Sequence, residues 1–216
     1  MNRIVLTLML LVLSAPAHAD YFLWEDPKSG LTVTFPDTWK TQVNRHVDDV
    51  LTVIAPSNGD DAVCKIKTSP DSRYTIFPSN YGKSVQKVAV SIPFWQSYMA
   101  NYDDYDIARV YDGGGLGRWI ASYATASYTE RDGTATKSRR AIMFASLYFD
   151  TLYVVECSAL APAYEAWERN FRSVIKSIDF KKIYHGRPTG DYADFLKKSD
   201  MHFWAQTGPE GTAGYN

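Results

Sequence analysis

The sequence is poor in the residues that most often build catalytic and metal sites. Only two cysteines and four histidines occur among 216 residues, and no two histidines stand at helical spacing. The patterns His-Glu-x-x-His and Gly-x-Ser-x-Gly, which mark zinc peptidases and many serine hydrolases, are absent. A triad assembled from distant residues leaves no such motif, so a small hydrolase with a dispersed site stays open. We predict no cofactor and no metal ion.

The sequence also lacks an excess of charge of either sign. Lys and Arg together number 23, against 24 Asp and Glu. Domains that bind nucleic acid usually carry a clear basic excess. We therefore predict no nucleic-acid partner.

Long hydrophobic runs are missing apart from one at the N-terminus. Arg3 precedes an apolar run from Ile4 to Leu13, Pro16 follows, and Ala17-His-Ala19 offers the small residues that a signal peptidase requires. About ten residues, at about 1.5 Å of rise each, cannot cross a hydrocarbon core of about 30 Å. We predict a signal peptide at residues 1–19, a periplasmic or secreted protein, and no stable membrane anchor after cleavage.

The two cysteines, Cys64 and Cys157, both lie in the mature chain. Each falls on the apolar side of an alternating run, at 62–66 and 153–157, so the two can meet in one core layer. In an exported protein an even pair favours a disulfide. Two buried thiols or a redox pair are the alternatives, and a redox pair normally shows the Cys-x-x-Cys spacing that is absent here.

Alternating apolar residues and turn signals predict a mostly antiparallel sheet. Asp132-Gly133 and Asp150-Thr151 favour tight hairpins between long runs. In the two longest runs both faces are largely apolar, so the sheet needs cover on both sides. We expect strands at 31–35, 42–47, 50–55, 62–68, 106–111, 118–129, 135–149 and 152–159.

Helices can supply that cover. Residues 164–178 carry an apolar stripe at intervals of three and four, residues 93–102 begin with a proline in the first turn, and residues 191–204 show a further amphipathic pattern. Residues 69–92 have no regular pattern. We predict an α+β fold, with an antiparallel sheet sandwiched between helices (α/β/α). It forms one domain over 20–180, and an extension over 181–216 carries one amphipathic helix.

Three local clusters invite chemical interpretations that the context does not favour. The glycines from Gly113 to Gly117 lack a phosphate-loop pattern and precede a strand, which favours a hairpin loop. Adjacent acids could bind a hard cation, but an EF-hand loop is absent. The compact basic cluster indicates a solvated strand end more than an anion site. These acids and bases are Asp48, Asp49, Asp60, Asp61, Asp103, Asp104, Asp106, Lys137, Arg139 and Arg140.

Two end segments resemble PsbP-like proteins. The stretch from Trp24 to Trp39 resembles their opening hairpin, and the stretch from Phe171 to Phe180 resembles their closing helix and strand. The resemblance implies an antiparallel sheet between helical layers and a mostly non-catalytic family of photosystem accessory, nuclear GTPase-binding and bacterial periplasmic proteins. This chain departs from the family at 69–92 and after Phe180, so no family binding residue is carried over.

These observations favour a non-catalytic accessory or binding protein that acts on an unknown protein or small ligand through a surface or groove. The alternatives are a small hydrolase that uses His185, and a carrier of a small apolar ligand held between sheet and helix. The candidate partner-binding residues are the aromatic and basic ones of the C-terminal extension: Tyr184, His185, Arg187, Tyr192, Phe195, Phe203 and Trp204.

Overall fold

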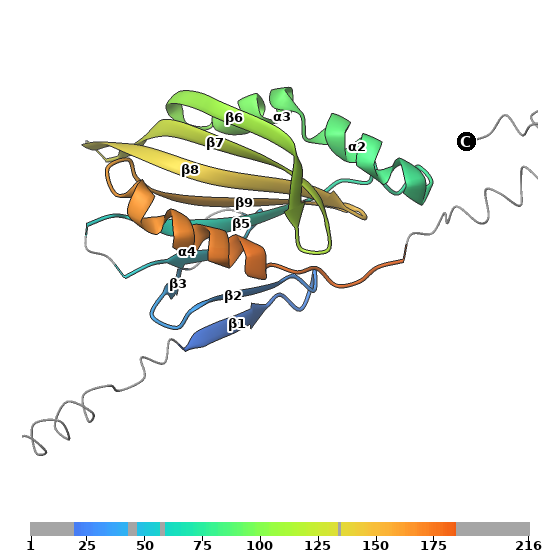
Figure 1. The fold of residues 1–216 in the computed structure, drawn as a ribbon, viewed down its shortest axis with the longest axis horizontal. Helices are drawn as coiled ribbons and strands as arrows, with labels where there is room; N and C mark the ends of the chain where they lie inside the picture. The colour runs from blue at the N-terminus through green and yellow to red at the C-terminus, as the bar shows by residue number, and fades with distance from the viewer. Residues whose placement is uncertain (1–19, 43–46, 57–58, 134, 185–216) are drawn as a thin grey trace, which may run out of the picture.

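The chain folds around a seven-stranded antiparallel sheet with helices on both faces (Figure 1). The computed structural model describes residues 20–42, 47–56, 59–133 and 135–184. This arrangement confirms the predicted α+β class and the cover on both sides of the sheet. A separate two-stranded hairpin, β1–β2, lies beside the sheet.

The strand order in the large sheet is β3-β4-β5-β9-β8-β7-β6, so the only sequence-distant neighbours are β5 and β9. All of its pairings are antiparallel. The strands are β3 (Lys40–Gln42), β4 (Asp49–Ile54), β5 (Val63–Pro70), β6 (Asp103–Leu116), β7 (Trp119–Asp132), β8 (Ala135–Tyr148) and β9 (Thr151–Leu160).

One core lies between the sheet and α4 (Tyr164–Ser177), together with β1 (Tyr21–Glu25) and β2 (Thr32–Pro36). The predicted stripe of α4 is its buried face, with Phe171 fully enclosed. The hairpin is fixed to the helix because Ser177 Oγ donates to the Thr34 carbonyl at 2.8 Å and accepts from the Thr34 amide at 2.9 Å.

A second core fills the opposite face, under α2 (Gly82–Ala89) and α3 (Ile92–Met99), which follow the short 3₁₀ helix η1 (Ser79–Tyr81). Trp95 is fully buried, and its indole N–H donates to Ser122 Oγ at 3.0 Å. Gln86 reaches the end of β8, where its amide accepts from the Leu147 N–H at 2.6 Å and donates to the Ala145 carbonyl at 3.1 Å.

Helix α2 corrects the prediction that 69–92 is irregular. It is eight residues long, and its buried residues are Gly82, Gln86 and Ala89. Val85 is half-buried on the same face, so a helical spacing of three and four is present, but Val85 is the only large apolar residue in it and the signal is short. Gly82 is required where it stands, because a Cβ there would lie 2.7 Å from the Trp119 ring.

The glycine-rich stretch is also corrected. Strand β6 runs to Leu116, so most of these glycines belong to the strand, and its register shifts between Tyr111 and Gly114. Only Gly117 occupies the turn, with φ at 57° and space for no side chain, since a Cβ would meet the Phe180 ring at 2.9 Å. Smaller departures are β1, which was absent from the expected strands although the resemblance implied a hairpin there, and Val47, which lies in a turn rather than a strand.

The predicted disulfide is confirmed. Cys64 of β5 and Cys157 of β9 stand directly opposite each other in the ladder, and their sulfurs are 2.02 Å apart. Both are fully buried in the core on the α4 side. The bond therefore joins the two halves of the sheet at their shared pair of strands.

Several predictions fall on residues outside the described ranges. They are the signal peptide at 1–19, the helix at 191–204, and all candidate partner-binding residues from His185 onward. The division into a domain and a C-terminal extension stays a prediction. Among the described residues, no helix has the length and apolar character needed to span a membrane.

Candidate functional site: a charged groove beside α3

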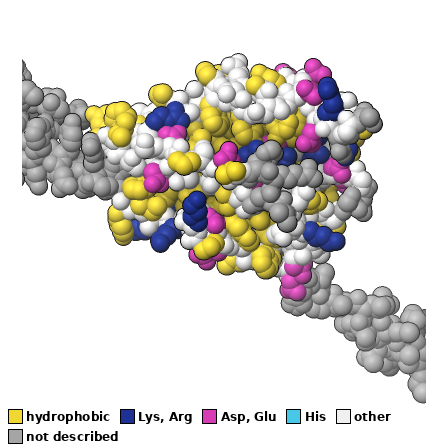
Figure 2. Space-filling view, turned by 180° about the vertical axis from the view of Figure 1, so that it is seen from behind, with side chains coloured by type: hydrophobic (Ala, Val, Ile, Leu, Met, Phe, Trp, Pro, Cys, Tyr) yellow, Lys and Arg dark blue, Asp and Glu magenta, His cyan; other side chains and the backbone are white. Residues whose placement is uncertain are grey.

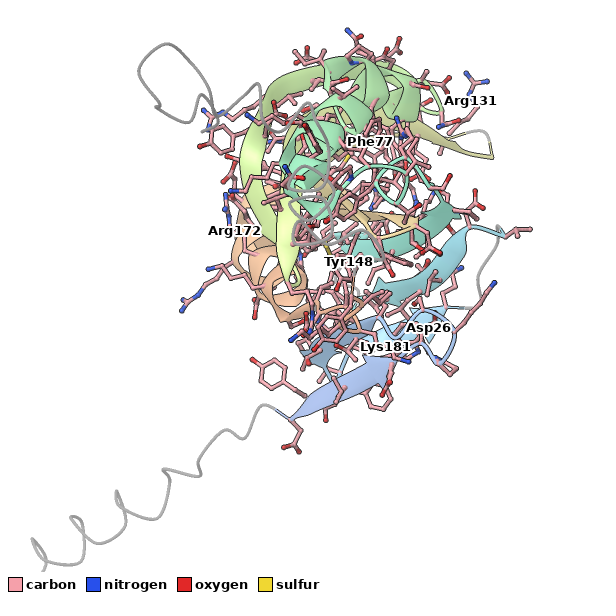
Figure 3. The ribbon with its side chains drawn as sticks, turned by 90° about the vertical axis from the view of Figure 1, so that its right-hand side faces the viewer. Asp26, Phe77, Arg131, Tyr148, Arg172 and Lys181 are labelled. Carbon is pink, nitrogen blue, oxygen red and sulfur yellow. A yellow bond between two sulfur atoms is a disulfide. The ribbon has the colours of Figure 1, made fainter. Side chains whose placement is uncertain are left out.

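A polar groove lies on the α3 side of the sheet, where α2 and α3 leave strands β3 to β5 uncovered. Its volume is about 910 Å³. Figure 2 faces this side and shows acidic and basic side chains intermixed on its right-hand part. In Figure 3, Arg131 of the groove and Arg172 of α4 project on opposite sides of the sheet. Five acidic residues, Asp48, Asp49, Asp61, Asp103 and Glu130, and five basic residues, Lys65, Lys67, Arg131, Lys137 and Arg139, line it.

A β-bulge turns Asp49 toward this groove. The register of β4 against β5 shifts between Asp49 and Leu51, so that Asp49 stands opposite Lys67. Without the extra residue, Asp49 would share the face of Leu51, which belongs to the core on the α4 side. Bulges commonly re-aim one side chain in this way. The side chain of Asp49 is only 7 % exposed, and its Oδ1 has no hydrogen-bond partner.

Most charges of the groove are paired at distances longer than a hydrogen bond. Lys65 Nζ lies 4.0 Å from Glu130 Oε1, and Lys67 Nζ lies 3.8 Å from Asp49 Oδ1. Glu130 Oε2 is also 3.6 Å from Arg139 Nε. At these separations the charges attract each other, but their donors and acceptors keep capacity for a further partner. Lys137 and Asp61 are the tighter pair, at 2.8 Å.

Arg139 corrects the prediction of a solvated basic cluster. Only 4 % of this residue is exposed, and its Nη2 donates to the Asp61 carbonyl at 2.7 Å and to Ser158 Oγ at 3.0 Å. Arg140 on the other face pairs with Glu165 of α4 at 2.7 Å. Alternation along β8 therefore divides the cluster between two faces of the sheet.

Glu156 of β9 anchors the inner wall of the groove. Its carboxylate is buried, and three tyrosine hydroxyls donate to it, each at 2.7 Å: Tyr98 and Tyr102 to Oε2, and Tyr128 to Oε1. Tyr102 also lines the groove. A buried charge needs hydrogen bonds and a nearby opposite charge, and Glu156 accepts three hydrogen bonds and feels the positive charge of Lys65.

The pKa values of these groups keep the carboxylate charged and the phenols neutral. Burial raises the pKa of Glu156, but the Lys65 charge and the three hydroxyl donations outweigh it, so the net pKa lies below the ordinary value. Burial and the adjacent Glu156 charge raise the pKa of Tyr98, Tyr102 and Tyr128. The tyrosines therefore act as permanent donors.

Sequence reasoning named some of these residues but missed their assembly. The acids at 48–49, 60–61 and 103–106 were interpreted as separate turns, yet all three segments contribute to one groove. Glu156, Lys65 and Lys67 were not singled out; the signal was a charge at alternate positions in an otherwise apolar strand. Tyr184, at the described end of the chain, is 79 % exposed and lies outside the groove lining.

The described residues contain no histidine, since all four fall outside the described ranges. Nor do they contain a group of three or more His, Cys, Asp or Glu side chains arranged to hold a metal ion. The predicted roles of His185 and Arg187 stay predictions.

No family model matches the chain, and no curated protein matches its sequence. Solved structures that it resembles include cyanobacterial PsbP from Synechocystis sp. PCC 6803. The sequence identity to it is 13 %, the match covers 79 % of this chain and 99 % of that chain, and the TM-score is 0.47. LpqN of Mycobacterium tuberculosis, involved in cell envelope biogenesis, has 11 % identity, coverage of 76 % and 92 %, and a TM-score of 0.46. The Ran-binding protein Mog1p of Saccharomyces cerevisiae has 6 % identity, coverage of 75 % and 96 %, and a TM-score of 0.43. PsbP, to which the two end segments were likened, is thus among the solved structures that this chain resembles.

Proposed function

We propose that this protein is an exported, non-catalytic binding protein that takes a small zwitterionic ligand, such as a short peptide, in the charged groove. Export rests on the sequence of residues 1–19. The ligand class rests on the groove, whose lining carries both signs of charge in equal number.

The observation that carries the proposal is the free Oδ1 of Asp49. A buried carboxylate oxygen without a hydrogen bond is costly unless a partner arrives. The Lys67 ammonium is 3.8 Å away, beyond hydrogen-bond distance. The Asp49 side chain is 7 % exposed, so a ligand ammonium would satisfy Oδ1 by taking the place of the Lys67 ammonium that stands 3.8 Å from it. The ligand carboxylate would then meet the lysines of β5, which hold only long ion pairs.

The wall around Glu156 favours binding over catalysis. A general base must reach the proton that it removes. The Glu156 oxygens already accept from three hydroxyls, and those phenols have raised pKa values, so none of them readily gives up its proton. This cluster holds the groove wall in one shape, as a preformed binding site requires.

The test is an NMR titration with trialanine and with the same peptide acetylated at its N-terminus and amidated at its C-terminus. We expect free trialanine to shift the amides of β4 and β5, and the capped peptide to bind at least about tenfold more weakly. Asp49→Asn should weaken trialanine by about tenfold, whereas Asp37→Asn, on an exposed turn, should not.

The spectrum of Asp49→Asn must match the wild type outside the groove, which separates lost binding from lost folding. Equal binding of free and capped peptide, or no shift in β4 and β5 at about 10 mM peptide, would refute the proposal.

A further inference from the structure

A second surface, remote from the charged groove in its lining residues, carries exposed apolar side chains around η1 and α2. Phe77, Tyr81, Val88 and Ile92 are all exposed, and Val88 is exposed by 77 %. None of them lines the groove. In Figure 1, α2 lies at the outer edge of the fold, and Figure 3 labels Phe77 in the loop before η1. We call these four residues the α2 surface.

The folding of α2 explains why this surface is turned outward. The helix packs on the sheet through Gly82, Gln86 and Ala89. Val88 therefore stands on the opposite side, among the exposed residues of the helix, as do Lys83 and Lys87. These apolar side chains do not pack in the core. Exposed apolar side chains gathered on one surface are a feature of interaction sites.

The segment that carries the α2 surface contains basic residues but no acidic ones. Residues 72–102 contain no Asp or Glu, but they contain Arg73, Lys83 and Lys87. Arg73 pairs with Asp71. Within the part of the chain that the structure describes, neither Lys83 nor Lys87 forms an ion pair. Two exposed cations thus stand among exposed apolar side chains, in a chain whose acids outnumber its bases overall.

We infer that the α2 surface docks on an anionic phospholipid bilayer. Apolar side chains that enter the headgroup region, beside lysines that reach the phosphates, are the features of interfacial helices. Tyrosine prefers the same boundary, and each lysine near an anionic surface adds to the attraction. The helix has only eight residues, so the attachment is peripheral and reversible.

The test uses the protein as the cell processes it, with its N-terminus determined by mass spectrometry. Co-sedimentation is measured with vesicles of equal parts phosphatidylglycerol and phosphatidylcholine, and with vesicles of phosphatidylcholine alone. We expect binding to the anionic vesicles, at least about tenfold weaker binding to the neutral ones, and a loss of binding as salt shortens the Debye length.

Matched variants locate the binding. Val88→Asp, and Lys83→Gln combined with Lys87→Gln, should each lower the bound fraction at least about fivefold. Val47→Asp changes another exposed valine, and Lys28→Gln with Lys176→Gln changes two other exposed lysines; both should bind as the wild type does. Circular dichroism confirms that each variant is folded.

Three results would overturn the inference. The first is no preference for anionic vesicles, and the second is equal binding by the α2-surface variants and their controls. The third is evidence, in the absence of vesicles, that another part of the protein or a second copy of it covers the α2 surface. It would appear as a dimer that Val88→Asp dissolves, or as NMR signals of residues 185–216 that Val88→Asp shifts.

Discussion

Tyr102 joins the groove to a buried carboxylate, because its hydroxyl donates to Glu156 Oε2 at 2.7 Å while its side chain lines the groove. Its ring also lies against Tyr128, with centroids 4.1 Å apart, and Tyr128 donates to the other oxygen of the same carboxylate. The shape of the groove wall is therefore tied to the charge state of a core residue.

Replacement of Glu156 should destabilise the fold. In Glu156→Gln, an amide N–H₂ replaces one acceptor oxygen and faces hydroxyl donors, and Lys65 loses a buried counter-charge. We expect the free energy of unfolding to fall by about 3 kcal/mol, measured by urea denaturation at pH 7. Glu168→Gln on α4, whose partner Arg172 is more than half exposed, should change it by less than about 0.5 kcal/mol. An equally small change for Glu156→Gln would contradict this account.

The same carboxylate predicts a pH dependence. The folded pKa of Glu156 lies below the ordinary value, so its contribution is complete above the unfolded pKa and is lost as the pH falls through the folded pKa. The stability gap between wild type and Glu156→Gln should therefore be largest near neutral pH and shrink toward pH values of about 3. Asp71 beside Arg73 and Asp179 beside Arg118 also have lowered pKa values. Both proteins contain Asp71 and Asp179, so the difference in stability between wild type and Glu156→Gln cancels the effect of these two groups. A difference that grows as the pH falls would contradict this account.

Gln86 should matter more than its position on a short helix suggests. Strand β7 pairs with β8 only as far as Ala145. There the Gln86 amide takes over, because it accepts from the Leu147 N–H and donates to the Ala145 carbonyl. Gln86→Leu leaves both backbone groups buried without this partner, and we expect a loss of about 3 kcal/mol in thermal or urea unfolding. Gln96→Leu on the exposed side of α3 is the control and should be nearly neutral.

The disulfide should be a major contribution to stability. It closes a loop with a sequence separation of 93, for which the chain-entropy model gives about 4 to 5 kcal/mol. Urea unfolding with and without a phosphine reductant measures the effect. The double variant Cys64→Ala, Cys157→Ala should resemble the reduced protein and show no response to reductant. If the free energy of unfolding is unchanged after complete reduction, the disulfide does not stabilise the fold.

Local signals predicted most of the fold. Strands β7, β8 and β9, the hairpin turns between them, α4 and the cysteine pair were recovered, because alternation, turn dipeptides and a helical stripe are properties of neighbouring residues. Helix α2 was missed because its eight residues give a single short repeat of helical spacing, in which Val85 is the only large apolar side chain.

The groove could not be predicted in the same way. Its residues come from β3, β4, β5, β6, β7 and β8 and from the segment that follows α3, which only the completed sheet brings together. The face that Asp49 occupies depends on a bulge, and a one-residue shift in register reverses which side of the sheet a side chain occupies. Arg139 was interpreted as solvated because its burial depends on Ser158 and Asp61 from other strands.

The pairing of β5 with β9 is the long-range contact that joins the two blocks of the sheet. Strands β3 to β5 and strands β6 to β9 are each built from hairpins, whose contacts are local and form readily. Joining the two blocks closes the longest loop in the sheet, which chain entropy opposes most. Until this pairing forms, β5 is an open strand edge with which another chain could pair.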